Sequence, residues 1–332
     1  MSCLVISHTQ VRELLPMATC IDLMAEALVT LGRGEATNPL RWGMRLPAGQ
    51  GILGMMPGQM GAPATLGLKV VAVFPGNHGT PYDSHQGVVL LFDPEHGFPT
   101  AIVDAAEITA IRTAAVSGLA TRLLAREDAT DLAILGSGVQ ARTHLEAMRT
   151  VREVARVRVY SRSRENRESF AATESKRHDL EVEAVGSAEA AVRGADLICT
   201  TTSAREPILC GDWLAPGAHL NAVGSSVASA RELDSQAVVR SRLSVDRRES
   251  TLNEGGDFLF PKQEGLIDND HIQGEIGEIL LGQMVGRRTP EEITLFKSLG
   301  LAVEDLAAAH YVYQQAREQG LGTPTEIGEI PS

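Results

Sequence analysis

A glycine-rich turn between an apolar run and a helical stretch constrains the fold of this chain more than any other feature. Residues 132–135 are the short apolar run typical of a buried parallel strand, and residues 141–148 are expected to form a helix. The residues of the turn are Gly136, Ser137, Gly138, Val139, Gln140 and Ala141. Gly136 permits a tight turn, Gly138 lets a pyrophosphate approach the backbone, and Ala141 keeps the helix close to the strand. Because the first N–H groups of a helix bind anions, this order predicts a dinucleotide site rather than an ordinary tight turn.

Further apolar runs after the turn predict more strands, which would form a parallel sheet with the strand of residues 132–135. They cover residues 157–160, 182–185, 196–202 and 219–226. In an open parallel sheet the ligand lies at the carboxyl ends of the strands. The threonines that end the fourth run and the glycine–serine loop that ends the fifth are therefore expected to approach the cofactor. The residues assigned to this edge are Thr201, Val223, Gly224, Ser225 and Ser226.

The position after the second strand of such a fold distinguishes the two nicotinamide dinucleotides. An acid there binds the 2′-hydroxyl of NAD, whereas arginine and serine accept the 2′-phosphate of NADP. This chain has Ser161 where the acid would stand, followed by Arg162, Ser163 and Arg164. We therefore expect NADP(H) as the favoured cofactor and NAD(H) as the alternative. The alternative is that these four residues form a solvated basic turn with no role in binding a cofactor.

The first third of the chain has a different pattern. Short apolar runs interrupted by glycine and proline predict an antiparallel sheet, and they cover residues 43–46, 51–56, 67–74, 87–92 and 101–104. After residue 270 the chain is expected to be helical, and residues 303–319 form a closing amphipathic helix. The predicted fold class is therefore α/β. It combines a Rossmann dinucleotide-binding domain with an α+β domain that contains an antiparallel sheet.

Four basic residues stand in places where a charge needs an explanation. Arg41 and Arg45 flank one strand and are four residues apart, so both are expected on the same side. For Arg45 a solvated outer face is an equal alternative. Lys69 lies inside an apolar strand, where an unpaired ammonium would be costly. Arg112 is the one charge in the small, apolar helix of residues 108–120, and it requires an anionic partner from the protein or a ligand. A guanidinium suits a substrate carboxylate.

Composition narrows the classes of partner. The net charge of −12 over 332 residues argues against nucleic acid and anionic membrane surfaces. The four cysteines have no metal-type spacing, so no metal site is predicted. We find neither a basic segment followed by an apolar core at the N-terminus nor a run of about 18 apolar residues. A cytoplasmic protein with a small-molecule partner is the expectation.

Several stretches of the chain resemble the ornithine cyclodeaminase/mu-crystallin family. They include Pro39-Leu-Arg41, Leu68-Lys-Val70, Arg112-Thr-Ala-Ala-Val-Ser117, the glycine turn, Gly217-Ala-His-Leu-Asn-Ala-Val-Gly224 and Phe296-Lys-Ser-Leu-Gly300. The resemblance implies a homodimer in which residues 1–125 with 304–332 bind substrate and dimerise, and residues 126–303 form the Rossmann domain. It also implies that Arg41, Lys69 and Arg112 hold the carboxylate of an α-amino or α-imino acid. Thr113 completes the predicted cofactor-binding residues.

Two positions depart from the cyclodeaminase members of that family. Ornithine cyclodeaminase carries an acid a few residues before its Met-Pro, where this chain has Gly54 before Met56 and Pro57. Cyclodeaminases and the related archaeal alanine dehydrogenase carry a catalytic aspartate where this chain has Ser226, and mu-crystallin has serine there as well. Serine can order a water or relay a proton, but it is no carboxylate base near neutral pH.

These features predict an NAD(P)H-dependent reductase that converts a cyclic or acyclic α-imino acid into an L-amino acid. Lys69 and Ser226 are the predicted catalytic residues, and Arg41, Arg45, Lys69 and Arg112 are the predicted substrate-binding residues. If Arg45 faces the pocket, the substrate carries a second carboxylate. The enzymatic alternatives are a cyclodeaminase of ornithine or lysine and an alanine-dehydrogenase-like amino-acid dehydrogenase. The alternative without catalysis is an NADP-binding, mu-crystallin-like protein that binds a small ligand.

Overall fold

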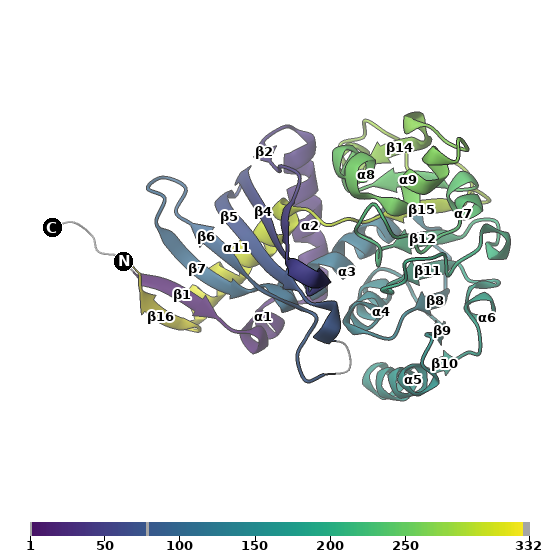
Figure 1. The fold of residues 1–332 in the computed structure, drawn as a ribbon, viewed down its shortest axis with the longest axis horizontal. Helices are drawn as coiled ribbons and strands as arrows, with labels where there is room; N and C mark the ends of the chain where they lie inside the picture. The colour runs from purple at the N-terminus through teal and green to yellow at the C-terminus, as the bar shows by residue number, and fades with distance from the viewer. Residues whose placement is uncertain (1, 78–79, 328–332) are drawn as a thin grey trace. The chain divides into compact units, whose positions relative to one another are not determined.

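The computed structural model describes residues 2–77 and 80–327 and consists of two compact units (Figure 1). One unit contains the chain up to Arg112 together with the segment that begins at Leu301, and the other is Thr113–Gly300. The sequence places the domain boundaries later, after residues 125 and 303. The first boundary in the structure falls inside one continuous helix, α3 (Ala105–Leu124). The small, apolar sequence of this helix gives no sign of a boundary.

The first unit is built on an eight-stranded sheet in which β3 pairs with β4 beside the path β16-β1-β7-β6-β5-β4-β2. The strands are β1 (Ser2–Ile6), β2 (Ala36–Thr37), β3 (Trp42–Arg45), β4 (Ile52–Gly61), β5 (Ala64–Val73), β6 (His85–Phe92), β7 (Pro99–Asp104) and β16 (Thr323–Glu326). The paired strands are antiparallel except β1 and β7, which are parallel. The expected antiparallel sheet is thus a mixed one, because the helices after β1 carry the chain away before it can form a hairpin.

Helices cover one face of this sheet. They are α1 (His8–Leu14), α2 (Met17–Gly32) and α11 (Ala302–Gln319), and α11 packs across β4, β5 and β6. A Cβ atom at Gly67 would lie 2.4 Å from Leu306, so glycine permits the close approach of α11 to β5. Along β5, Thr65, Gly67 and Lys69 are buried, whereas the residues between them are partly exposed. Lys69 therefore belongs to the covered face of the sheet.

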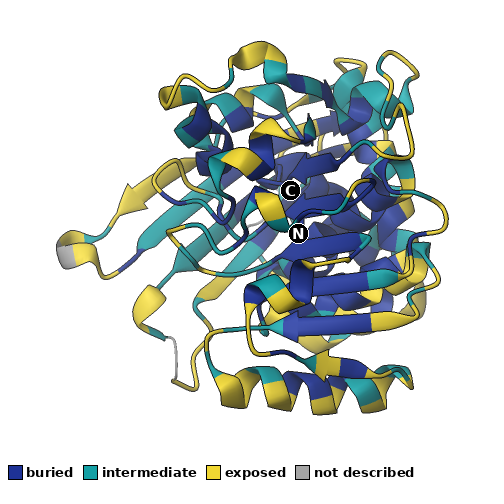
Figure 2. Cartoon of the chain, turned by 90° about the vertical axis from the view of Figure 1, so that its right-hand side faces the viewer, coloured by how far each residue is buried: buried dark blue, intermediate teal, exposed yellow. Residues whose placement is uncertain are grey.

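The second unit contains an eight-stranded parallel sheet with the order β10-β9-β8-β11-β12-β15-β13-β14. Its strands are β8 (Asp131–Leu135), β9 (Arg156–Tyr160), β10 (Val182–Ala184), β11 (Leu197–Thr200), β12 (His219–Ala222), β13 (Arg242–Val245), β14 (Ile272–Glu275) and β15 (Thr294–Lys297). The central strands are almost wholly buried (Figure 2), as expected for a parallel sheet with helices on its faces. The predicted Rossmann fold is confirmed.

The helices of the second unit connect these strands. Besides the later part of α3 they are α4 (Val139–Val151), α5 (Arg164–His178), α6 (Ala188–Val192), α7 (Ser235–Val239), α8 (Arg248–Glu254), α9 (Gly256–Gln263) and α10 (Ile276–Leu280). Short 3₁₀ turns complete the chain at Pro47–Gly49, Pro75–Asn77, Gly211–Trp213 and Asn269–His271. Among the described residues no single helix is long and apolar enough to cross a membrane, and only the pair α1 and α2, bent by 85°, passes the same test together.

The segment after residue 270 differs from its prediction. It was expected to be helical, but it contains β14, β15 and only the short helix α10. β15 lies between β12 and β13, and its four residues are all buried. A four-residue strand that includes polar residues, such as Thr294 and Lys297 in β15, gives neither an apolar run nor a periodicity that separates a strand from a helix, which explains why this prediction was wrong.

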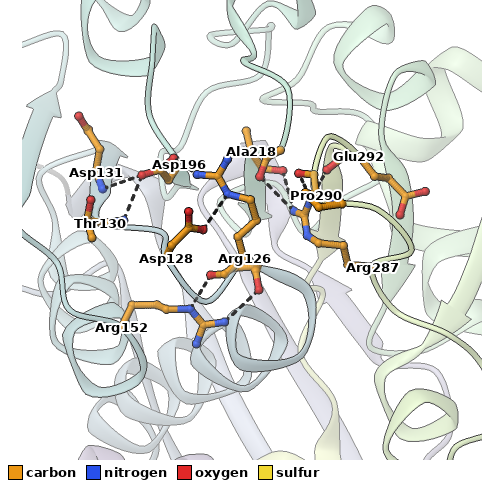
Figure 3. Close-up of polar contacts among 12 residues, drawn as sticks. Arg126, Asp128, Thr130, Asp131, Arg152, Asp196, Ala218, Arg287, Pro290 and Glu292 are labelled. Atoms are coloured by element: carbon orange, nitrogen blue, oxygen red, sulfur yellow. Dashed lines mark hydrogen bonds and ion pairs between the residues drawn. The ribbon is translucent and has the colours of Figure 1, made fainter.

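Arginines hold the edge of the parallel sheet where its strands begin (Figure 3). Arg126 donates to Asp196, directly before β11, across 2.5 Å, and the second carboxylate oxygen of Asp196 accepts the N–H groups of Thr130 and Asp131. Arg152 and Arg287 donate to carbonyl oxygens at the C-terminal end of α3. These contacts satisfy backbone groups that a helix end leaves without partners.

Candidate active site

The first glycine of the turn has a packing role. Gly136 has φ of +126°, a conformation that side chains rarely adopt. A Cβ atom there would lie 2.5 Å from the hydroxyl oxygen of Thr201 and 2.9 Å from its carbonyl oxygen. The N–H of Gly136 donates to the carbonyl oxygen of Tyr160 across 2.8 Å. Gly136 therefore lets the end of β8 close tightly on the ends of its neighbours β9 and β11.

The second glycine opens the space that a phosphate needs. A Cβ atom added to Gly138 would meet no atom of the described chain within 4 Å. Gly138 is the N-cap of α4, and the first helical bond runs from the N–H of Arg142 to its carbonyl oxygen. The N–H groups of the preceding turn thus have no acceptor within the helix. Ala141 is fully buried against the sheet. This arrangement fits the pyrophosphate of a dinucleotide.

The basic turn after β9 is partly committed to internal contacts. Ser137 donates to Ser161 across 3.0 Å, Ser161 donates to the carbonyl oxygen of Ser163, and Ser163 caps α5. Arg164 forms an ion pair with Glu168 at 2.7 Å. Arg162 is exposed and has no hydrogen bond or ion pair to any residue within the described ranges. Of the two predicted arginines, Arg162 is the one whose charge is not shared with a protein carboxylate.

A buried carboxylate joins the carboxyl ends of two central strands. Glu232 is fully buried and accepts four hydrogen bonds of 2.7 Å, from the hydroxyl of Thr200, the N–H and hydroxyl of Thr202, and the N–H of Gly224. A Cβ atom at Gly224 would lie 2.1 Å from the carbonyl oxygen of Thr202, so glycine is required there for packing. The sequence assigned Thr201, Val223 and Gly224 to this edge but missed Glu232.

A second buried network lies under the loop that follows β12. Lys297, at the end of β15, is 1% exposed and donates to the carbonyl oxygens of Ala222 and Ser225. Its ammonium is 3.0 Å from Asp257, which accepts the N–H groups of Glu232 and Leu233. Ser225 is buried, whereas Ser226 is partly exposed. Lys297 and Asp257 were missed because single charges in short segments give no periodic signal.

The first unit contains a buried cluster of two cations and two carboxylates. Lys69 lies 2.6 Å from Asp305, and Arg112 donates to Asp305 at 2.8 Å and to Glu304 at 2.9 Å. All four side chains are at most 5% exposed. The predicted need of Lys69 and Arg112 for anionic partners is thus met by two residues of α11 that the sequence did not single out. An acidic pair in the first turn of a helix is ordinarily explained by the helix dipole.

The ammonium of Lys69 is displaced from its ordinary titration range. The pKa of Lys69 is lowered to about 8, because burial and the charges of Arg112 and Arg41, which lower it, outweigh the charge and hydrogen bond of Asp305, which raise it. Such a group is largely protonated near neutral pH and still able to release its proton. Arg112 has no such freedom, because a guanidinium stays charged.

Strand register relates the other predicted residues to Lys69. In β4 and β5, Met56 lies opposite Lys69, and Gly54 lies opposite Val71 on the same face. Arg41 directly precedes β3, and Arg45 ends it opposite Ile52. By this register Arg45 shares the face of Lys69, as expected for the pocket side, but its side chain is exposed. Thr113, the first residue of the second unit, is buried in α3.

The glycine turn at the start of α4, the parallel sheet and the buried cations together define an α/β oxidoreductase that uses a dinucleotide. The chain belongs to the ornithine cyclodeaminase/mu-crystallin family, which matches residues 1–320.

Its relatives include imine reductases. A Δ1-pyrroline-2-carboxylate reductase of Bacillus cereus is 37% identical over 98% of this chain and 100% of the relative. A ketimine reductase mu-crystallin of Mus musculus is 43% identical over 84% of this chain and 85% of the relative. Among solved structures, Thermococcus litoralis Δ1-pyrroline-2-carboxylate reductase in complex with NADH and L-proline is 40% identical, with a TM-score of 0.94 over 96% of this chain and 99% of that one.

These similarities confirm three predictions from the sequence: the family, the α/β fold class and an NAD(P)-dependent oxidoreductase of amino or imino acids. The roles assigned to single residues remain predictions.

Proposed function

We propose that this protein is a reductase of α-imino acids that uses NADPH or NADH and produces an L-amino acid. The buried cluster of Lys69, Asp305, Arg112 and Glu304 carries this proposal. Burying two cations and two carboxylates costs several kcal/mol in desolvation, so a purely structural role is a poor reason to retain them. The imine reductases among the relatives support this choice of substrate.

The second unit fits the cofactor. The open space at Gly138 and the N-terminus of α4 suit a pyrophosphate, and the residues proposed to bind it are Gly136, Ser137, Gly138, Val139, Gln140 and Ala141. When bound, the cofactor supplies the hydride that reduces the imine carbon. The protein binds it, orients it and excludes water.

We propose NADPH as the preferred cofactor because Arg162 is exposed beside Ser161, where a 2′-phosphate would bind. Arg162→Ala is expected to raise the Kd for NADPH about tenfold, the loss of one charge-assisted hydrogen bond, and to leave the Kd for NADH unchanged. Arg164→Ala is the matched control, since Arg164 pairs with Glu168. A wild-type preference for NADH would contradict this part of the proposal.

Lys69 is proposed as the catalytic residue at the imine. Its Nζ donates a hydrogen bond to the imine nitrogen, and this proton keeps the imine electrophilic. Because the pKa of Lys69 is lowered, the ammonium can also transfer that proton. Arg41 and Arg112 bind the carboxylate and orient the substrate. Ser226 is partly exposed at the edge of the parallel sheet and is proposed to order a water.

We propose a substrate with one carboxylate. Asp305 and Glu304 balance the charges of Lys69 and Arg112, so these four residues together with Arg41, whose charge acts on Lys69, have a net charge of +1, which suits one carboxylate. Arg45 is the remaining candidate. Arg45 lies opposite Ile52 of β4, and Lys69 lies opposite Met56 of the same strand. The two positions are therefore four residues apart along β4, a distance of about 13 Å. The two carboxylates of a small dicarboxylic imine are much closer together. Arg45→Ala is therefore expected to leave turnover of every imine unchanged.

The decisive experiment follows NADPH and NADH oxidation with three kinds of substrate. They are Δ1-pyrroline-2-carboxylate, pyruvate with methylamine, and oxaloacetate with ammonia as a dicarboxylic imine. We expect the cyclic monocarboxylate to react fastest, and Lys69→Met to abolish turnover while NADPH still binds. Release of ammonia from ornithine with catalytic NAD would favour a cyclodeaminase. Tight NADPH binding without turnover of any imine would favour a ligand-binding protein.

A homodimer is the assembly that we propose. The face of the first unit's sheet that α11 leaves uncovered presents Trp42, Met44 and Leu66, which are 57%, 44% and 36% exposed. An exposed apolar sheet face of this kind is typical of an interface with a second copy.

A further inference from the structure

The loop after β12 is fixed from below by charges that are expensive to bury. Lys297 and Asp257 are 1% and 2% exposed, and Glu232 is fully buried. These three residues come from distant parts of the chain and meet at the carboxyl ends of β11, β12 and β15. An apolar residue of similar volume would fill the place of a buried lysine at lower cost. The retained charges therefore call for a role beyond stability.

Each contact of this network fixes a defined backbone group of the loop. Glu232 accepts the N–H of Gly224, and Lys297 donates to the carbonyl oxygen of Ser225 at 2.5 Å. The hydroxyl of Ser225 donates to the carbonyl oxygen of Ala230, so the loop also closes on itself. A Cβ atom at Gly256 would lie 1.9 Å from that same oxygen, so α9 presses directly against the loop. The loop is held on several sides before any ligand binds.

The contact with Lys297 determines where the next N–H points. The peptide between Ser225 and Ser226 is trans, since the cis bond of the described chain is that of Ala62 and Pro63. In a trans peptide the carbonyl oxygen and the N–H point in opposite directions. With its oxygen directed at Lys297, this peptide turns the N–H of Ser226 away from the buried network. Ser226 is partly exposed, and its N–H has no acceptor in the part of the chain that the structure describes.

We infer that Lys297 is a positioning residue, which sets the Ser225–Ser226 peptide so that the N–H of Ser226 donates to the carboxamide oxygen of a bound nicotinamide. Asp257 keeps the ammonium in place and at the same time holds the backbone of Glu232. The network thereby ties the orientation of the nicotinamide to the strand ends. This inference rests on the proposed use of a nicotinamide dinucleotide.

The test compares two double variants that remove equivalent charge pairs. Lys297→Met with Asp257→Asn removes the network under the loop. Arg126→Met with Asp196→Asn is the matched control at the opposite edge of the same sheet, where Asp196 also accepts two backbone N–H groups (Figure 3). The Lys297 double variant loses one ion pair of the second unit, and the Arg126 double variant loses two, because Arg126 also pairs with Asp128 at 3.2 Å. Thermal unfolding measures the common loss of stability.

The readout is binding of two ligands. One is the reduced dinucleotide, NADPH or NADH, that the wild type binds more tightly. The other is ADP-ribose, with a 2′-phosphate if NADPH is that cofactor, which lacks the nicotinamide. We expect the Kd for the dinucleotide to rise about tenfold in the Lys297 double variant, as for the loss of one hydrogen bond, and the Kd for the ADP-ribose ligand to stay within about twofold. The Arg126 double variant is expected to bind both ligands as the wild type does.

A modified cofactor addresses the carboxamide directly. The thionicotinamide analogue replaces the carboxamide oxygen by sulfur, a weaker acceptor, so the wild type should bind it more weakly than the normal cofactor. The Lys297 double variant should no longer distinguish the two. If that variant does not fold, Lys297→Gln, which keeps a donor of reduced reach, serves in its place. Equal weakening of the dinucleotide and the ADP-ribose ligand would overturn the inference, whereas failure of the wild type to bind either would overturn the proposed function.

Discussion

The pair of Lys69 and Asp305 makes a single-residue prediction about pH. Asp305 raises the pKa of Lys69 against the larger effect of burial, which brings it to about 8. Removing that carboxylate charge by Asp305→Asn therefore lowers the pKa of Lys69 further. If the protonated ammonium is required, the alkaline limb of the kcat/KM profile should move to lower pH by about one pH unit, the usual effect of one close charge.

Glu304→Gln is the matched control for this experiment, because Glu304 contacts Arg112 rather than Lys69. It should cost stability by weakening a buried ion pair but leave the alkaline limb in place. An alkaline limb that is the same in Asp305→Asn and the wild type would exclude Lys69 as the titrating group.

The two glycines of the turn should respond differently to the same substitution. At Gly136 a side chain meets both a positive φ and the atoms of Thr201, so Gly136→Ala should destabilise the protein by about 1–3 kcal/mol. At Gly138 a Cβ atom meets no described atom, so Gly138→Ala should leave the melting temperature nearly unchanged. Its methyl group occupies the space proposed for the pyrophosphate, and the Kd for the dinucleotide should rise at least tenfold. An equal change in melting temperature for Gly136→Ala and Gly138→Ala would contradict this distinction between the two glycines.

At the scale of elements, a buried histidine joins α4 to α3. His144 is fully buried, with one ring nitrogen 2.7 Å from the carbonyl oxygen of Gln140 and the other 2.9 Å from the hydroxyl of Ser117. Burial lowers the pKa of His144 to about 4. The unfolded chain, with a histidine pKa near 6.5, therefore binds the proton more readily than the folded one.

The free energy of unfolding of the second unit should consequently decrease as the pH is lowered. The contribution of His144 is complete above about pH 6.5 and is lost as the pH falls towards 4, which amounts to on the order of 2 kcal/mol between pH 7.5 and 5. Urea unfolding at these two pH values measures the loss. His144→Gln should reduce the difference, although His219, whose pKa burial lowers to about 3, keeps part of it. His96→Gln, with a side chain 66% exposed, should change nothing. An undiminished pH dependence in His144→Gln would contradict this assignment.

The elements that the sequence predicted well are those with a strong pattern. The strand, glycine turn and helix around Gly136, and the long helix α11, occur where periodicity and turn residues indicated them. β13, β14 and β15 were missed because each is short and includes polar or charged residues, such as Arg242, Gln273 and Lys297, so that neither an apolar run nor a period shows. Their place in the sheet depends on neighbours far away in the chain.

At the scale of the whole molecule, the limit of sequence reasoning is the pairing of distant residues. Lys69 and Arg112 could be found because each is a charge in an apolar run. Their partner Asp305 is more than 190 residues from either. In the sequence it belongs to an ordinary acidic helix start, and only the packing of α11 on the sheet brings it to the cations. The same holds for Glu232, Asp257 and Lys297, which no local pattern connects.

The uncovered face of the sheet in the first unit leads to a prediction about assembly. This face presents the exposed apolar residues Trp42, Met44 and Leu66, and Leu66 is the one that lies on the ten-residue strand β5. A carboxylate there would be desolvated in a dimer but remains in water in a free chain. Leu66→Glu should therefore shift the protein from dimer to monomer at micromolar concentration, measured by sedimentation velocity, with little change in the fold of the single chain. Val285→Glu, at an exposed apolar residue of the second unit, is the control and should leave the mass unchanged. A Leu66→Glu variant that sediments as the wild type does would remove this face as the interface.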